Sequence, residues 1–433
     1  MKAFLMTFTM FGMLAETGTA EYLKHAQILG GADTRIEQIR KGDAKLVLAD
    51  SKGKALPAGT KVEIEQVKHQ FLFGCNIFKL FNCETPEQNT AYEKLFSELF
   101  NFATLPFYWW AYERTADTNL DDTTDRIIKW CREHNITPKG HPLAWNYVDP
   151  KWLPDDPKAS MDIQMARIGK CMKRFEKDIL LWDVVNEAVE HDRPDLKKNS
   201  PKLTEAIRLM GVPAYVTQAF SEARKANPNA NLIINDYCTD QKYENLVLSK
   251  LVDKSGKPSY DIIGIQSHMH GGYWVPEKTW YTCESFAKLN KPIHFTEATI
   301  LSNIKTEKGW EVNSESEAKQ AREVVEFYTI LFSNPMVEAI TWWDFSDQGA
   351  WMAAPAGFLR KDMTPKPAYE ELKKLIKGKW WTKAQVRTQE NGNVNFRGFY
   401  GQYRVKATIA GKNVEGIVEF KKGDTTPISV KME

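Results

Sequence analysis

Two glutamates each end a short apolar run in this sequence. Glu187 ends the run at residues 182–187 (WDVVNE), and Glu297 ends the run at residues 293–297 (IHFTE). Hydrolysis of a glycosidic bond needs one carboxyl group that protonates the leaving oxygen and another that attacks the sugar or activates water. A single glutamate in such a position is commonly an ion-pairing residue, but two in matching positions favour a pair of catalytic carboxyls.

Both glutamates belong to a repeating pattern of short apolar runs and longer amphipathic stretches. Stretches such as 122–134, 161–175 and 315–332 have apolar residues three or four positions apart, which is typical of helices. The alternation indicates βα units, and eight strands with crossovers predict an α/β fold, the (β/α)8 TIM barrel. The eight predicted strands are residues 71–77, 102–108, 137–145, 179–186, 231–237, 262–268, 293–298 and 339–345. Active sites of such barrels lie at the C-terminal ends of the strands, where both glutamates stand.

The two ends of the chain alternate in the manner of strands. Residues 45–66 alternate around glycine and proline turns, which predicts a β-hairpin-like unit. The tail from about residue 382 has the same character, with a turn at Asn391-Gly392-Asn393. We expect residues 33–70 and 381–433 to pair into one small β-sandwich-like accessory module beside a barrel at 71–380, although two separate modules also fit the pattern.

The first twenty residues predict a secretory signal peptide. Lys2 precedes an apolar run too short to cross a bilayer, and small residues permit cleavage after Ala20, with Ala15 as the competing site. No later segment is apolar enough to span a membrane. We therefore expect a secreted or periplasmic protein.

Charge and cysteine spacing argue against other classes of protein. The chain has 58 basic and 56 acidic residues, a net charge of +2, so it lacks the positive field that would collect a nucleic acid. Its six cysteines lack the C-x-x-C spacing of zinc sites, which favours buried small side chains, with one disulfide as a variant, over metal binding. His268 and His270 share a face of one predicted strand, but two ligands do not make a metal site. The 14 tryptophans fit core filling or flat platforms for sugar rings.

Six motifs in order resemble those of the family 10 glycoside hydrolases, which are chiefly endo-β-1,4-xylanases. The resemblance covers roughly residues 71–375, and WDVVNE is its most specific part. The motifs are Phe73-Gly74-Cys75-Asn76, residues 140–145 (GHPLAW), residues 182–187, Gln266-Ser267-His268, Thr296-Glu297 and residues 341–351.

The resemblance implies a retaining double displacement, with Glu187 as the acid/base and Glu297 as the nucleophile. It also implies that Asn186 donates to the 2-hydroxyl of the attacked sugar and that His141 holds the same ring. A hydrogen bond to this hydroxyl strengthens as the oxocarbenium-like transition state forms, so these roles are chemically reasonable.

Further substrate contacts follow from the same resemblance. Gln266 and His268 are expected to support the nucleophile, and Trp343 and Trp351 to stack around the attacked sugar. Trp145 completes this set of expected substrate-binding residues. The resemblance implies no metal and no organic cofactor.

Several positions depart from the family pattern. Pro106 and Trp109 stand where an Asn and a Lys usually grip the sugar nearest the nucleophile, and Thr299 stands where an Asp usually orients the supporting histidine. Each lost hydrogen bond to a sugar changes binding by roughly 1 kcal/mol. We therefore expect remodelled substrate subsites around a retained catalytic pair. Smaller departures are Asn146 for His, Val148 for Gln and Asp344 for Gly.

The aromatic run Tyr108-Trp109-Trp110 ends a predicted strand, which favours a sugar platform in the cleft over a plug in the core. Trp109 is accordingly counted among the substrate-binding residues. His270 fits a place in the cleft or beneath the following glycine turn equally well, and Trp380-Trp381 is expected to pack the linker to the tail.

Three hypotheses for function remain. The first is a monomeric, endo-acting retaining enzyme that cleaves xylan or a substituted xylan without metal or cofactor. The second keeps this mechanism but changes the substrate to another β-linked or decorated polysaccharide or oligosaccharide. The third is a carbohydrate-binding barrel without catalysis. The two retained glutamates argue against it, because a protein that only binds gains nothing from two desolvated carboxyl groups.

Overall fold

A computed structural model describes residues 24–306, 309–409 and 411–433 of the chain. The expected signal peptide at residues 1–20 lies outside the described residues. Of the described helices, none combines the length and the apolar character that a membrane crossing requires.

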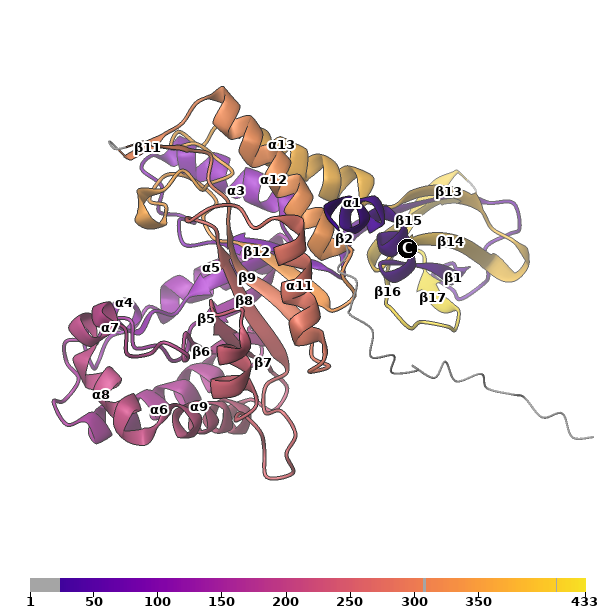
Figure 1. Cartoon of the computed structure of the whole chain (residues 1–433). Helices are drawn as coiled ribbons and strands as arrows, with labels where there is room; N and C mark the ends of the chain where they lie inside the picture. Colours follow the sequence, from indigo (N-terminus) through magenta and orange to yellow (C-terminus); the bar gives the residue numbers. More distant parts are fainter. Residues whose placement is uncertain (1–23, 307–308, 410) are drawn as a thin grey trace, which may run out of the picture.

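The centre of the molecule is a closed barrel of parallel strands (Figure 1). Neighbours in the barrel follow the order of the sequence, and the last strand pairs with the first through Ala339 and Leu72. All eight predicted strands and the predicted barrel are thus confirmed. The strands are β3 (Leu72–Asn76), β4 (Phe102–Pro106), β5 (Thr137–His141), β6 (Leu181–Asn186), β7 (Asn231–Asp236), β8 (Ile262–His268), β9 (Ile293–Thr299) and β12 (Val337–Trp342).

Helices surround the barrel, and side chains cap the first turns of some of them. The side chain of Asp156 accepts a hydrogen bond from the Ala159 N–H at the start of α6, and Asn313 does the same for Ser316 at the start of α12. The larger helices are α3 (Pro86–Leu99), α5 (Asp121–Glu133), α6 (Pro157–Arg174), α8 (Pro201–Met210), α9 (Val212–Ala226), α11 (Pro276–Ala287), α12 (Ser314–Phe332) and α13 (Pro367–Lys374). Short elements lie in the loops: α4 (Trp109–Tyr112), α7 (Pro194–Asn199), α10 (Gln241–Tyr243), β10 (Ile304–Thr306) and β11 (Gly309–Glu311).

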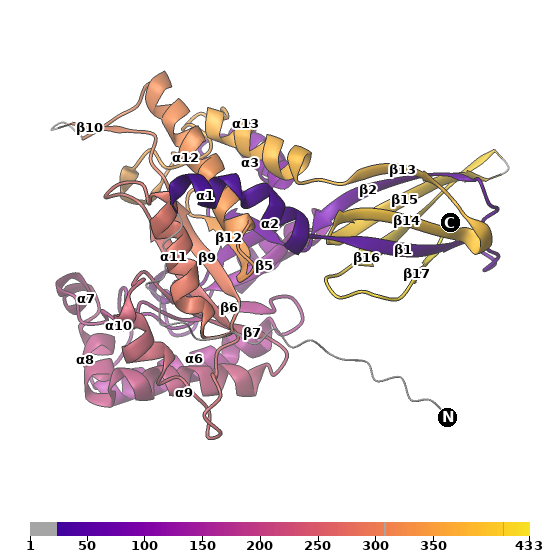
Figure 2. The same cartoon turned by 45° about the vertical axis from the view of Figure 1, so that its right-hand side comes forward.

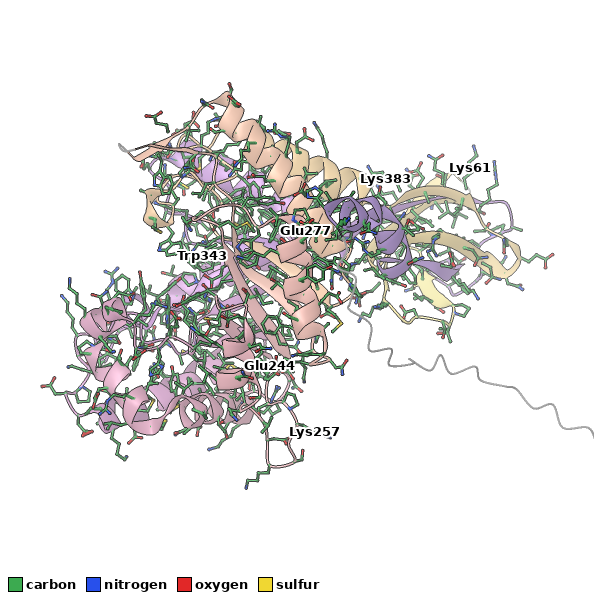
Figure 3. The ribbon with its side chains drawn as sticks, in the orientation of Figure 1. Lys61, Glu244, Lys257, Glu277, Trp343 and Lys383 are labelled. Carbon is green, nitrogen blue, oxygen red and sulfur yellow. The ribbon has the colours of Figure 1, made fainter. Side chains whose placement is uncertain are left out.

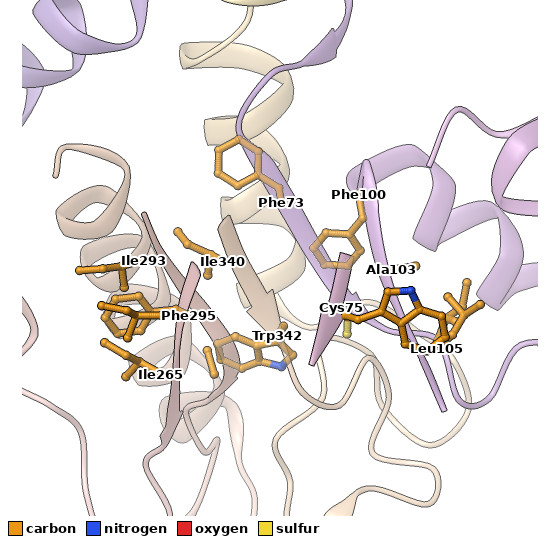
Figure 4. Close-up of a cluster of buried hydrophobic side chains, with 14 of the residues drawn as sticks. Phe73, Cys75, Phe100, Ala103, Leu105, Ile265, Ile293, Phe295, Ile340 and Trp342 are labelled. Atoms are coloured by element: carbon orange, nitrogen blue, oxygen red, sulfur yellow. The ribbon is translucent and has the colours of Figure 1, made fainter. Parts of the chain in front are cut away.

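The main hydrophobic core lies between the strands and these helices. Phe295 of β9, for example, packs against Phe327 of α12 with 5.7 Å between ring centroids. Figure 4 shows Ile293, Phe295 and Trp342 among the buried side chains of this core. A second, small apolar cluster consists of residues near the N-terminal ends of the barrel strands and fills that end of the barrel. The opposite mouth is left to polar groups. The members of the cluster are Phe102, Leu181, Ile233, Ile262 and Ala339.

Strands from the two ends of the chain form the accessory module, as predicted (Figure 2). One sheet has the order β14-β1-β17 and the other β13-β2-β15-β16. Leu46 and Ile64, from different sheets, belong to one buried core between the sheets. The strands are β1 (Lys41–Ala49), β2 (Lys61–His69), β13 (Lys383–Arg387), β14 (Asn393–Phe399), β15 (Gly401–Ile409), β16 (Lys412–Phe420) and β17 (Ile428–Lys431).

Two details of the predicted N-terminal segment are wrong. β1 and β2 do not form a hairpin, because each pairs with strands of the tail and their apolar faces meet across the module. The segment expected to be strands from residue 33 begins with a helix, α2 (Ala32–Ile39), which follows α1 (His25–Gly30). Both helices lie between the barrel and the module (Figure 2).

Arg40 joins the module to the barrel. Its guanidinium donates to the backbone carbonyls of Phe332, Asn334 and Val337 and lies 4.7 Å from the ring centroid of Phe71. Val337 is the first residue of β12, so the module contacts the N-terminal end of the barrel. Figure 3 shows the resulting separation between Trp343 in the barrel and the module lysines Lys61 and Lys383.

Candidate active site

Glu187 and Glu297 line one cleft at the C-terminal end of the barrel. Glu187 follows β6 and is 7% exposed, whereas Glu297 lies in β9 and is 4% exposed. The cleft has a volume of about 840 Å³. The other predicted site residues that line it are Trp145, Gln266, His268, Trp343 and Trp351.

The backbone at Glu187 is in the left-handed region, with φ of 54°. This conformation is uncommon for a residue with a side chain and is typical of functional positions held by their surroundings. The Glu187 N–H donates to the Asn235 carbonyl (2.9 Å), which anchors the turn after β6. Its side chain accepts from Gln266 Nε2 (3.2 Å) at Oε1 and from Arg193 Nη1 (2.7 Å) at Oε2.

Glu297 is held by polar groups from three other strands of the barrel, β5, β7 and β8. Asn235 Nδ2 donates to its Oε1 (2.7 Å), and His268 Nε2 lies 3.0 Å from its Oε2. His141 Nε2 lies 3.9 Å from Oε1. These contacts fix the carboxyl group before any ligand arrives, which is what electrostatic preorganisation requires.

Asn235 connects the two catalytic candidates and was not predicted. Its amide nitrogen donates to Glu297 and also to Asn186 Oδ1 (2.7 Å), and its own oxygen accepts from the Thr296 hydroxyl. Gln266 Nε2 also donates to Asn186 Oδ1 (3.2 Å). The signal was available, because Asn235 is a polar residue near the C-terminal end of an apolar strand, as the two glutamates are.

His141 lies buried behind the cleft with a fixed tautomer. Its Nδ1 is 2.7 Å from Asp183 Oδ2, which also accepts from Lys139 Nζ at 2.6 Å. Burial alone would raise the pKa of Asp183, but Lys139 and His141 outweigh it and lower that pKa. The Asp183 carboxylate therefore keeps a proton on Nδ1. His141 Nε2 forms no hydrogen bond with any described residue and is free to meet a ligand hydroxyl.

Burial raises the pKa of both catalytic candidates. For Glu187, Arg193 opposes this shift and the charge of Glu297 adds to it. For Glu297, the opposing groups are His141 and Lys139. The charge of Glu297 favours the protonated form of Glu187, whereas the contacts of Glu297 with Asn235 and His268 favour its own charged form. The separate roles of the two carboxyls stay a prediction.

Thr299 replaces the expected aspartate beside His268. The Thr299 hydroxyl lies 2.9 Å from His268 Nδ1. It therefore orients the imidazole ring, as the expected carboxylate would have done. Burial lowers the pKa of His268 to about 4. A neutral ring that accepts from Thr299 at Nδ1 presents an N–H to Glu297 at Nε2, which favours the charged carboxylate.

Aromatic rings form one wall of the cleft. Trp343 makes edge contacts with Phe78 (5.5 Å between centroids) and His141 (5.2 Å). Trp351 is 43% exposed, and its backbone N–H donates to Asp344 Oδ2 (3.2 Å). The flat, exposed ring of Trp351 beside buried carboxyls is suited to stacking against the face of a sugar.

The predicted role of Trp109 is wrong. Trp109 is 5% exposed, packs in a cluster with Leu153 and Leu203, and donates from Nε1 to Glu113 (2.9 Å). Its neighbour Trp110 is 44% exposed and lines the cleft, as does Tyr108. The aromatic run therefore contributes to the cleft, but through the residues on either side of Trp109.

A cationic part of the cleft was also missed by the sequence analysis. Arg193, in the loop after β6, and Lys278 of α11 line the cleft together with Tyr237 and Trp274. His270 lines it too, which settles its two expected locations in favour of the cleft. Arg193 is six residues from Glu187 in an irregular loop, so no periodicity marks it.

Two remaining expectations concern residues outside the cleft. Asn146, which stands where the family has a histidine, is buried and donates to the His191 carbonyl (2.7 Å) and to Thr204 (2.8 Å). It therefore braces loops behind the cleft. All six cysteines are unpaired, and the described part of the chain has no cluster of three or more His, Cys, Asp or Glu side chains suited to a metal ion.

Adjacent tryptophans should respond differently to truncation. Trp109→Ala removes a buried ring and should lower the free energy of unfolding by about 3–5 kcal/mol. Trp110→Ala removes an exposed ring and should change it by about 0.5 kcal/mol or less. Denaturant unfolding of both variants measures this, and equal losses would contradict the assignment of Trp110 to the cleft surface.

His268 should remain neutral throughout the neutral pH range. Burial disfavours its charged form, so the ring should titrate near pH 4 rather than 6.5. Thr299→Asp places a carboxylate on Nδ1 and should raise this pKa, because a negative charge stabilises the imidazolium. Nitrogen NMR of labelled histidine measures both values, and a wild-type pKa near 6.5 would refute the suppression of the charged form.

The comparisons with known proteins agree with this arrangement. The family model described as glycosyl hydrolase family 10 matches residues 66–375. Endo-1,4-beta-xylanase B of Paenibacillus barcinonensis is 32% identical over 250 residues, which cover 53% of this chain and 72% of that protein. Anti-sigma-I factor RsgI6 of Acetivibrio thermocellus is 26% identical over 392 residues, covering 89% of this chain and 47% of that protein.

Solved structures give the same fold. Native xylanase 10B of Thermotoga maritima superposes with a TM-score of 0.59 at 23% identity, covering 72% of this chain and 96% of that one. The chain spans less than half the length of RsgI6 and 38% of endo-1,4-beta-xylanase A of a Caldicellulosiruptor species, which is 27% identical. Because the family model covers most of the chain, including both glutamates, the chain belongs to glycosyl hydrolase family 10.

Proposed function

We propose that this chain is a retaining β-glycoside hydrolase that cleaves β-1,4-xylan or a related substituted β-glycan. The observation that carries the proposal is the pair Glu187 and Glu297, both buried and both facing one cleft of a family 10 barrel. Several hydrogen-bond donors surround the pair, which supports a preorganised pair of catalytic carboxyls.

The reaction proceeds in two displacements. Glu297 attacks the anomeric carbon while Glu187 gives its proton to the departing glycosidic oxygen, which forms a covalent glycosyl-enzyme and releases the first product. Glu187 then removes a proton from water, and the resulting hydroxide attacks the anomeric carbon and frees Glu297. The two inversions restore the original anomeric configuration.

We expect Asn186 and His141 to bind the sugar that is attacked. Asn186 uses its oxygen to accept from Asn235 and Gln266, so its amide nitrogen, with only a 3.5 Å contact to Glu187 Oε1, remains available as a donor. His141 Nε2, which forms no hydrogen bond with any described residue, supplies a free acceptor for a sugar hydroxyl. Donors that meet sugar hydroxyls at the transition state contribute directly to rate.

Removal of either carboxyl tests the mechanism. Glu187→Gln should lower kcat/KM on xylan about 100- to 10,000-fold, the usual contribution of a general acid, and much less on an aryl β-xyloside whose phenol needs no proton to leave. Glu297→Gln should abolish turnover of both. Hydrolysis rates and NMR of the first-formed anomer measure this.

Glu205→Gln on the exposed face of α8 is the matched control and should leave rates unchanged. Turnover that survives in Glu297→Gln, or a first product of inverted configuration, would refute the retaining mechanism.

The substrate is the less constrained part of the proposal. Pro106 and Trp109, which stand where the family pattern has an Asn and a Lys, do not line the cleft, and Tyr108 and Trp110 present aromatic rings to it instead. A panel of β-glycans and aryl β-glycosides identifies the polymer, and a different β-linked or decorated substrate with the same mechanism remains the second hypothesis.

A carbohydrate-binding barrel without catalysis is the second candidate function. It is favoured by one observation, that a relative matching 89% of the chain is an anti-sigma factor, RsgI6. Binding of oligosaccharides by the intact protein, with no turnover of any glycan in the panel, would support this candidate over the enzyme.

We further propose that the chain is exported and cleaved after Ala20, on the evidence of its Lys2 and the following apolar run. The mature protein recovered from outside the cytoplasm should begin at Glu21. Mass spectrometry of its N-terminal peptide measures this, and recovery of a cytoplasmic protein that retains Met1 would contradict export.

A further inference from the structure

Arg193 makes an ion pair with the candidate acid. Its Nη1 lies 2.7 Å from Glu187 Oε2 and also donates to the Tyr237 hydroxyl (3.2 Å), while its Nε donates to Asp195 (3.2 Å). The side chain is 22% exposed and lines the cleft. A cation in this position favours the charged form of Glu187, which opposes the protonated state that an acid needs.

Part of the Arg193 guanidinium is available to a ligand. Nη2 forms no hydrogen bond with any described residue, although Nη1 and Nε are both engaged. The partner of Nε, Asp195, is 53% exposed and therefore easily exchanged for another anion. The free Nη2 and the Nε that holds the exchangeable Asp195 could together donate to the two oxygens of a carboxylate.

A second cation lines the same cleft. The Lys278 ammonium is 4.1 Å from the centroid of the Trp274 ring and forms no ion pair with a described carboxylate. Arg193 and Lys278 are the cationic side chains among the described residues that line the cleft, whereas the wall of Phe78, Tyr108 and Trp343 is aromatic. The cationic lining therefore favours a negatively charged sugar, whereas the aromatic wall favours an uncharged one.

Arg193 lies where the leaving part of the substrate would bind. Arg193 and Tyr237 contact Glu187 or its neighbours, and no contact joins either to Glu297. The attacked sugar must reach Glu297, whereas the departing oxygen must face Glu187. The group next to Arg193 is thus the leaving part of the substrate.

We propose that Arg193, assisted by Lys278, binds a carboxylate carried by the leaving part of the substrate, as in a glycan with uronic acid substituents. This inference rests on the proposed function. A substrate carboxylate bound at Nη2 would add a negative charge that offsets the effect of the Arg193 cation on Glu187. Glu187 could then take up a proton from solvent and pass it to the glycosidic oxygen, so that binding of the correct substrate completes the acid.

The test compares two xylo-oligosaccharides of equal length, one with a single glucuronic acid branch and one without. The wild type should cleave the branched one with the higher kcat/KM and leave the branch on the departing fragment, as seen by mass spectrometry. Arg193→Met should reduce the ratio of the two kcat/KM values about 10- to 100-fold, the effect of losing one charge-assisted hydrogen bond, and Arg193→Lys should restore part of it.

Arg208→Met is the matched control, because it removes the same side chain from the exposed surface of α8 and should keep the wild-type ratio. An unchanged ratio in Arg193→Met, or cleavage that leaves the branch on the other fragment, would overturn the proposal. A sulfated oligosaccharide forms a third arm, and a preference for it over the uronic acid would overturn the assignment to a carboxylate.

Binding separates this inference from the proposed function. Calorimetry with Glu297→Gln measures affinity without turnover, and the branched ligand should bind about 10-fold or more tightly than the unbranched one, a difference lost when Arg193→Met is added. If the wild type cleaves neither ligand while this difference persists, the hydrolase proposal fails and carboxylate binding by Arg193 stands. Equal affinities would refute the role of Arg193 whatever the rates.

Discussion

Two carboxyl groups held away from water impose the main constraint on this barrel. Removing a carboxylate from water costs several kcal/mol unless polar partners replace the solvent, so the groups around Glu187 and Glu297 are fixed by that requirement. Asn235 meets it most economically, since one amide contacts Glu297 and Asn186 together. The Lys139–Asp183 pair beneath them meets the same requirement indirectly, because it orients His141 toward Glu297.

The barrel makes this arrangement possible because its parallel strands all end at one mouth. Groups from β5, β6, β7, β8 and β9 meet within hydrogen-bonding distance although they span residues 137–299 of the sequence. The left-handed backbone at Glu187 is the local consequence. A regular strand would point successive side chains to opposite faces, and the turn at Glu187 instead lets both it and Asn186 serve the cleft.

The sequence was informative where a pattern has one physical cause. Apolar runs with helices between them identified every barrel strand, because a buried parallel strand tolerates little else. Alternation located β1 and β2 but not their partners, since it records which face is buried and not which strand lies beside it. Trp109 and Trp110 were confused because α4 begins there, and one helical step turns neighbouring side chains by about 100°. Arg193 stands in an irregular loop, so only the folded chain brings it to Glu187.

The pairing of β1 with β14 joins Lys41 to Phe399, partners separated by almost the whole chain. Closing so long a loop is entropically costly unless the barrel between them is already compact. The accessory module should therefore assemble late, after β3 and β12 have come together at the barrel seam. Arg40 donates to the carbonyl of Asn334, which precedes β12, and to that of Val337, its first residue. The finished module therefore holds the closed barrel at its N-terminal end.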